Sequence, residues 1–168
     1  MATAPDAITY RALGADLALT RYAGTPSSVP LDAADSWGTL DLQVVAGGKG
    51  GLAQSGDIRD AGSVAGRQNL AQALVLRLLT QLGALSPLGH PDYGSRLVEL
   101  IGRLNDDTTR NLARLYTLEA LKQEPRVKQI LDLTVETASD QIDTIRIGFS
   151  VLPLNDTDPL ALALEVTL

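Results

Sequence analysis

The sequence predicts an α+β fold: an N-terminal extended arm, about three helices, and then a C-terminal three-stranded antiparallel meander. Three observations support this order. Proline, glycine and serine punctuate the first 65 residues, helical spacing of apolar residues begins near Arg67, and strict alternation begins after Val127. The change of period falls at Glu124-Pro125-Arg126, where proline lacks a backbone donor and disfavours helix in the preceding residue. We therefore expect the last helix to stop near Gln123, with two opposite charges held close together beyond it.

Composition limits the class of protein. The chain has 168 residues, of which 45% are hydrophobic, 20% charged and 4% aromatic, so one domain with a core of Leu, Val, Ile and Ala is expected. It has no cysteine, which excludes disulfides and thiolate metal sites. The net charge of -6 disfavours nucleic-acid binding. The sequence shows neither a secretion signal nor an apolar run that could span a bilayer, so we expect a soluble protein made in the cytoplasm.

Residues 1–65 are predicted to form an extended arm with short strands. Residues 8–10 and 40–44 alternate well enough to be brief strands. Residues 22–30 are typical of a loop, and the glycine-rich tract 46–51 is typical of a flexible linker. The low apolar density predicts that this arm is ordered mainly by the surface on which it lies.

The second unit, residues 66–168, opens with the first predicted helix, over residues 67–82 and ending at Gly83. Its apolar stripe is Leu70, Leu74, Val75, Leu78, Leu79 and Leu82. Residues 85–94 contain two prolines and are predicted to be a turn-rich connector.

Two further helices are predicted before the proline corner. Ser95 can cap a short one. Its inward residues are expected to be Leu97, Leu100, Ile101 and Leu104. Residues 105–107 supply a cap and negative charge for a helix over residues 108–123. Its expected buried residues are Leu112, Leu115, Tyr116, Leu118 and Leu121.

Three alternating segments follow. The apolar positions are Leu131, Leu133 and Val135 in the first, Ile145, Ile147, Phe149 and Val151 in the second, and Leu160, Leu162, Leu164, Val166 and Leu168 in the third. Short turns separate the segments, so consecutive strands must be antiparallel, with one face of the sheet packed on the helices.

The last of these strands is a candidate partner-binding element. It alternates strongly and carries few charges or prolines that would protect a sheet edge. At an edge it could pair with a strand of another protein. The alternative is a covered or merely terminal strand with a structural role only.

Catalytic residues are not indicated. His90 is the only histidine and lies in a turn, so paired-imidazole metal sites are excluded and a surface or packing role is expected. Glu119, Glu124 and Asp92 could be combined into a glycosidase pair, but nothing in their spacing places two of them across a cleft. The glycine-rich stretch 48–53 is not followed by a helix and lacks the Ser or Thr of a phosphate-binding loop. We therefore expect that the protein is not an enzyme and that it binds neither a cofactor nor a metal.

Residues 69–80, then 90–97, then Glu124-Pro125-Arg126 ahead of a strand together resemble the baseplate wedge and sheath-initiator family of contractile tails. That family includes phage baseplate proteins and a type VI secretion counterpart, and some members carry a lysozyme-like label. The resemblance covers about residues 66–168. It implies a virion tail baseplate component, assembled in the bacterial cytoplasm, whose partners are wedge proteins, the tail sheath protein and the tail tube.

The resemblance also implies which residues bind. Wedge proteins would engage Glu124, Pro125 and Arg126. The sheath would share strands with the 127–168 meander, and a ring of copies would add avidity to each weak contact. Residues 1–65 lie beyond the family core; we hypothesise a clamp along the wedge or tube, with a flexible arm as the alternative. A peptidoglycan-cleaving, lysozyme-like enzyme and a generic α+β adaptor of another assembly remain the other readings.

Overall fold

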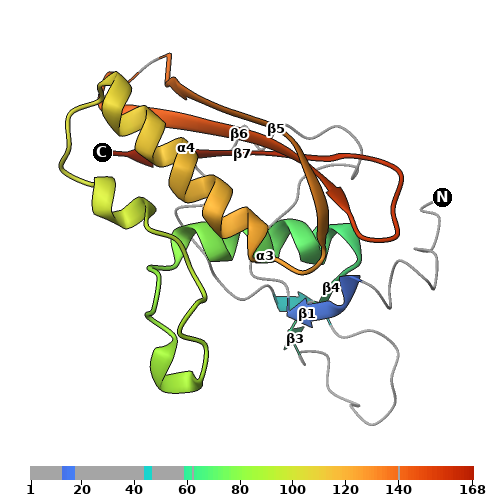
Figure 1. Ribbon diagram of the computed structural model, residues 1–168. Coiled ribbons are helices and arrows are strands. Elements are labelled where there is room, and N and C mark those ends of the chain that lie inside the picture. Colours follow the sequence, from blue (N-terminus) through green and yellow to red (C-terminus); the bar gives the residue numbers. More distant parts are fainter. Residues whose placement is uncertain (1–12, 18–43, 47–58, 62, 140) are drawn as a thin grey trace, which may run out of the picture.

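The structure, a computed structural model, describes residues 13–17, 44–46, 59–61, 63–139 and 141–168. Two α-helices lie in this part of the chain, α3 (Arg67–Leu79) and α4 (Asp107–Lys122). The C-terminal sheet consists of β5 (Val127–Thr137), β6 (Thr144–Pro153) and β7 (Leu160–Thr167). In Figure 1, α4 lies across this sheet and α3 lies next to α4. The predicted mixture of helices and a C-terminal three-stranded antiparallel sheet is confirmed.

β6 is the centre of the sheet, because it pairs with β5 on one side and β7 on the other. Its residues alternate between the two faces of the sheet, as predicted. The four predicted apolar residues face the core: Ile145, Ile147, Phe149 and Val151. They meet buried side chains from both helices in one hydrophobic cluster, which gives the sheet one face packed on helices.

β5 departs from the predicted alternation because it contains two irregularities. Its register with β6 shifts between Val127 and Gln129 and again between Ile130 and Asp132. The second shift leaves Leu131 without an opposite residue, and its side chain is 45% exposed. Ile130 packs on the core in its place. The prediction that Leu131 faces inward is therefore wrong, because the extra residue of a β-bulge interrupts the alternation of faces at that position.

α3 ends one turn earlier than predicted. Its last residue is Leu79, and the next residue, Thr80, is extended, with its hydroxyl donating to the Leu76 carbonyl at 2.7 Å. Leu79 and Leu82 are consequently exposed. The four earlier members of the predicted stripe are buried: Leu70, Leu74, Val75 and Leu78.

The predicted middle helix is instead a short 3-10 turn, Leu97–Leu100, preceded by another at Ser86–Leu88. Leu97 and Leu100 are buried as expected, whereas Ile101 and Leu104 are 60% and 83% exposed. Ser95 precedes this 3-10 turn and no α-helix: its hydroxyl donates to the Leu78 carbonyl at 2.6 Å and accepts the Leu97 N–H at 3.3 Å. The described part of the chain thus has two α-helices and not three.

α4 begins with the predicted acidic cap. Asp106 is the N-cap, and its side chain accepts the Thr109 N–H at 2.7 Å, which lowers the pKa of Asp106. Tyr116 and Leu121 are buried as predicted, but Leu115 is 46% exposed.

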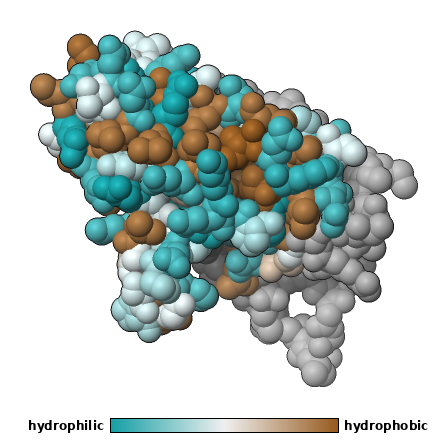
Figure 2. All heavy atoms as spheres, in the orientation of Figure 1, coloured by the Kyte–Doolittle hydropathy of each residue, from teal (hydrophilic) through white to brown (hydrophobic). Residues whose placement is uncertain are grey.

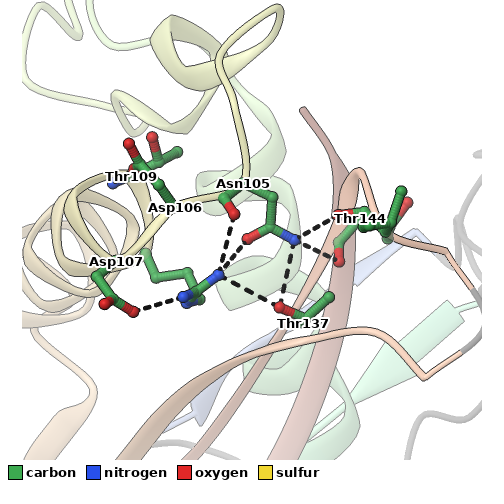
Figure 3. A network of polar contacts seen from close by, with 8 residues as sticks. Asn105, Asp106, Asp107, Thr109, Thr137 and Thr144 are labelled. Carbon is green, nitrogen blue, oxygen red and sulfur yellow. Dashed lines mark hydrogen bonds and ion pairs between the residues drawn. The ribbon is translucent and has the colours of Figure 1, made fainter.

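A polar network ties the start of α4 to the turn between β5 and β6 (Figure 3). The Asn105 amide donates to the Ile142 carbonyl at 2.8 Å, and its side-chain oxygen accepts from Arg110 at 2.7 Å. Arg110 also reaches the Thr137 hydroxyl at 3.3 Å. The network fixes the helix against one end of the sheet.

Among the described residues, four short strands precede α3. β1 (Ala15–Leu17) pairs with β4 (Ser63–Ala65), and β2 (Val44–Ala46) pairs with β3 (Arg59–Ala61). Of the strands predicted here, residues 8–10 and 40–43 lie outside the described residues. Leu13, just before β1, is fully buried in the core.

Candidate interaction surfaces

The predicted corner lies between α4 and β5. α4 ends at Lys122 with Gln123 as its C-cap, as the proline predicts. The chain then turns through Glu124, whose carbonyl accepts the Val127 N–H at 3.1 Å. The turn leaves Pro125 exposed and Arg126 partly exposed, whereas Glu124 is buried.

Glu124 binds two arginines of its own chain. Its Oε1 accepts from Arg126 Nε at 2.6 Å, and its Oε2 lies 3.4 Å from Arg77 Nη2. Burial alone would raise the pKa of Glu124, but the Arg126 hydrogen bond and the charges of Arg126 and Arg77 outweigh burial, so this pKa is lowered. The carboxylate is therefore ionised and already engaged inside the chain.

Arg126 joins the corner to the N-terminal segment. Its Nη1 donates to the Leu13 carbonyl at 3.1 Å, and the same carbonyl accepts the Asn69 amide at 2.8 Å. The Arg126 guanidinium is thereby held by Glu124 and by the N-terminal segment.

Beside the corner is a pocket of about 380 Å³, lined by Arg77, Gly89, His90, Pro91, Asp92, Tyr93 and Gln123. The Arg77 guanidinium stacks over the Tyr93 ring, 4.5 Å from its centroid. Burial raises the pKa of Tyr93 and outweighs the opposing charge of Arg77. The sequence predicts a turn-rich connector over residues 85–94 and does not indicate this pocket.

Gly94 explains why the loop keeps this position. Ser95 forms a parallel bridge with Gln81, and Ser95 N–H donates to the Thr80 carbonyl at 2.8 Å. At this crossing Gly94 has a φ of +115°, and a Cβ there would lie 2.7 Å from the Thr80 and Gln81 carbonyl oxygens. Only glycine fits, so Tyr93 is set next to α3 by the backbone itself.

The second surface is the outer edge of β7. Leu168 N–H donates to the Asp143 carbonyl, and the register places Leu164 opposite Ile147, so every second residue from Leu168 backward bonds to β6. The intervening residues direct their N–H and C=O groups away from β6: Ala161, Ala163, Glu165 and Thr167. Among the described residues, no strand pairs with this edge.

This geometry locates the residues predicted for strand sharing. Leu160, Leu162 and Leu164 are buried, and Val166 and Leu168 pack against the core. They anchor the strand, while the alternate residues present the free backbone groups. In a strand, the backbone groups change direction with the same period of two as the side chains. The alternation in the sequence therefore also indicates which residues of β7 direct their N–H and C=O groups to the same side.

Arg67 fixes the start of β7. Its guanidinium forms an ion pair with Asp156 and donates to the Asp158 and Pro159 carbonyls, each at 2.7 Å. The turn before the strand is thus tied to the first residue of α3.

Apolar side chains also form a band over α4 and the adjoining sheet (Figure 2). Leu115 on α4 and Leu131 on β5 are each nearly half exposed.

The residues considered for catalysis do not converge. His90 and Asp92 are exposed beside the pocket, Glu119 is exposed on α4, and Glu124 is buried. A glycosidase general acid needs a raised pKa, and that of Glu124 is lowered. In the ranges that the structure describes, no group of His, Asp and Glu is placed to hold a metal ion. No helix there combines the length and apolarity needed to cross a bilayer.

The fold is similar to that of a solved structure, a Geobacter sulfurreducens protein with the provisional name tail lysozyme. The two chains are 21% identical with a TM-score of 0.51, over 60% of this chain and 88% of the other. At this identity the likeness shows the fold alone. No protein-family model and no curated protein matches the sequence.

Proposed function

We propose that this protein is a structural baseplate component of a contractile tail or injection machine. In this role it docks on wedge proteins through the Glu124-Pro125-Arg126 corner and templates the first sheath ring by sharing strands through β7. Two findings are consistent with the tail assignment: the motif resemblance over residues 66–168, and the fold shared with a protein provisionally named for a tail.

The observation that carries the proposal is the edge of β7. The strand is regular over eight residues, its core side is anchored by leucines, and four alternate residues offer backbone groups outward. A partner strand could pair there through main-chain bonds, which depend little on sequence.

The opposite edge of the sheet is less suitable. β5 carries two register shifts, and bulges of this kind protect an edge from adding strands. β7 has no shift in its register with β6. The difference favours β7 as the edge that accepts a partner.

At the corner, Arg126 and Pro125 are the surfaces available to a wedge protein. Glu124 contributes by holding the Arg126 side chain, since its own carboxylate is bonded within the chain. A ring of copies would compensate for the small size of each contact. In the same proposal the N-terminal arm contacts the wedge or the tail tube.

Electron microscopy of particles tests the role. We expect tubes and baseplates that stay bare of sheath when the protein is absent, and again when it is truncated before Leu160. Normal sheath on the truncated protein would exclude strand donation by β7. Normal sheath without the protein would exclude the sheath-initiator role.

A single substitution tests strand donation with the fold kept intact. Proline at Ala163 removes an N–H that points away from β6, so the β6–β7 bonds survive. We expect Ala163→Pro particles to lack sheath, whereas the control Ala163→Val, which keeps the N–H and favours a strand, supports sheath assembly. Equal sheath on both variants would contradict the proposal.

The enzymatic alternative is a peptidoglycan hydrolase. It predicts that the purified protein cleaves peptidoglycan and that Glu119→Gln or Glu124→Gln abolishes cleavage. Because the pKa of Glu124 is lowered and Glu119 lies exposed on α4, we expect no such activity.

A further inference from the structure

The corner contains two arginines that share one carboxylate. Arg77 and Arg126 are both bonded to Glu124. Arg77 also lines the concave surface beside the corner, where a low dielectric strengthens the attraction of its guanidinium for an anion. The carboxylate of Asp92, in the same lining, and that of Asp16, whose charge acts on Tyr93, oppose this attraction.

Arg77 is the less satisfied of the two arginines. The residue is 8% exposed, and its one ion pair within the described residues is the 3.4 Å contact between Nη2 and Glu124 Oε2. Its buried Nε has no hydrogen-bond partner among the described residues. A guanidinium has five donors, and a buried one that uses so few incurs a desolvation cost that an added acceptor would offset.

The pocket next to Arg77 has the chemistry to receive that acceptor. Tyr93 covers one face of the guanidinium, which leaves its edge for hydrogen bonds. The Gln123 amide and the His90 ring line the same pocket and can each donate a further bond. Asp92 is also in the lining, but it is exposed and forms no bond with Arg77.

We infer that this pocket binds a carboxylate side chain, an Asp or Glu of the protein that docks on the corner. The carboxylate would accept hydrogen bonds from Arg77, with Gln123 and His90 at its sides. Together with Glu124 it would provide one negative charge for each of the two arginines, Arg77 and Arg126. The pocket would thus recognise a carboxylate of the protein that docks on the Glu124-Pro125-Arg126 corner. The identity of that protein rests on the proposed function. Bidentate pairing with arginine would fix the orientation of the docked segment as well as its affinity.

The site itself can be tested on the free full-length protein, with acetate as the probe. We expect the Nε–H resonance of Arg77 in ¹⁵N spectra to shift saturably with sodium acetate, at ionic strength held constant with sodium chloride. Arg67, which is already paired with Asp156, is the internal control and should not shift. A response of Arg77 that is no larger than that of Arg67, or that does not saturate, would overturn the inference.

Two variants sharpen this measurement. In Arg77→Gln, the acetate-dependent shift of the Tyr93 ring should disappear; its persistence would show that another group binds the anion. Asp92→Asn removes a like charge from the lining, so it should lower the acetate concentration needed for half-saturation several-fold. An increase in that concentration would contradict the assigned position of the carboxylate.

A cross-link in assembled particles identifies the occupant. With a photo-reactive residue in place of exposed His90, we expect a cross-linked peptide of a baseplate protein that includes Asp or Glu close to the linked position. A baseplate peptide without an acidic residue would overturn the inference and leave the proposed function standing. Absence of any tail-protein cross-link from both His90 and exposed Pro125 would instead count against the proposed function.

Discussion

Arg126 Nε lies 2.6 Å from Glu124 Oε1, so a charged hydrogen bond spans Pro125 and closes the turn at the end of α4. Because Glu124 is almost fully buried, this bond and the longer one to Arg77 stabilise a charge that would otherwise be costly to remove from water.

The first prediction concerns Glu124 and pH. The native pKa of Glu124 is below its usual value of about 4.5, so its stabilisation is complete above that pH and is lost as the pH falls through the native pKa. Glu124→Gln should lower the free energy of unfolding at pH 7 by about 2 kcal/mol. The difference between variant and wild type should shrink toward pH 3 in urea unfolding. A difference independent of pH would show that the carboxylate charge is not responsible.

The second prediction concerns the network in Figure 3. Asn105→Ala removes the bonds to Ile142 and Arg110 and should cost about 1–2 kcal/mol in the free energy of unfolding. Asp107→Ala is the control, because Asp107 is bonded to the same Arg110 but is 93% exposed, and it should cost less than about 0.5 kcal/mol. Equal effects would mean that the network does not hold the helix to the sheet.

Gly94 is the subject of the third prediction. Gly94→Ala places a methyl group 2.7 Å from two carbonyl oxygens at a positive φ, so it should destabilise the fold by about 2–3 kcal/mol and displace Tyr93. Gly89→Ala, where φ is also positive but no atom lies within 4 Å, should cost only about 1 kcal/mol. Thermal unfolding measures the stability, and the acetate response of Tyr93 reports the position of the loop.

The fourth prediction is a stabilising change. Thr117 is fully buried, and its hydroxyl has no partner in the part of the chain that the structure describes. Thr117→Val keeps the shape and removes the unsatisfied group, so it should raise the free energy of unfolding by about 1 kcal/mol. Thr144→Val should do the opposite, because the buried Thr144 hydroxyl bonds to Gln141 at 2.8 Å. Loss of stability in both variants would imply that Thr117 has an unseen partner.

The sequence correctly predicted those features that are determined by residues close together in the chain. Pro125 marks the end of α4, Asp106 caps its start, and the alternation of β6 gives its buried face. In each case the cause lies within a few residues of the effect, so no knowledge of the tertiary fold is needed.

The wrong predictions occur where contacts between residues far apart in the sequence determine the structure. The face of Leu131 depends on a bulge that only pairing with β6 produces. The segment after Ser95 forms a 3-10 turn because Ser95 is bonded to Thr80 and Leu78 on another element. The corner brings together residues 47 positions apart, Arg77 and Glu124, and no spacing rule joins them.

Leu13 has a practical consequence for anyone who shortens this protein. Its side chain lies in the core, and its carbonyl receives hydrogen bonds from Asn69 and Arg126. A fragment that starts at Gly66 would lack the Leu13 side chain, which would leave a cavity in the apolar core. It would also lack the carbonyl that accepts a hydrogen bond from Arg126, so it would be unsuitable for measuring how Arg126 binds a partner. Residues 13–17 therefore belong to the C-terminal fold. Any shortened version of the protein must retain them or receive them as a separate peptide.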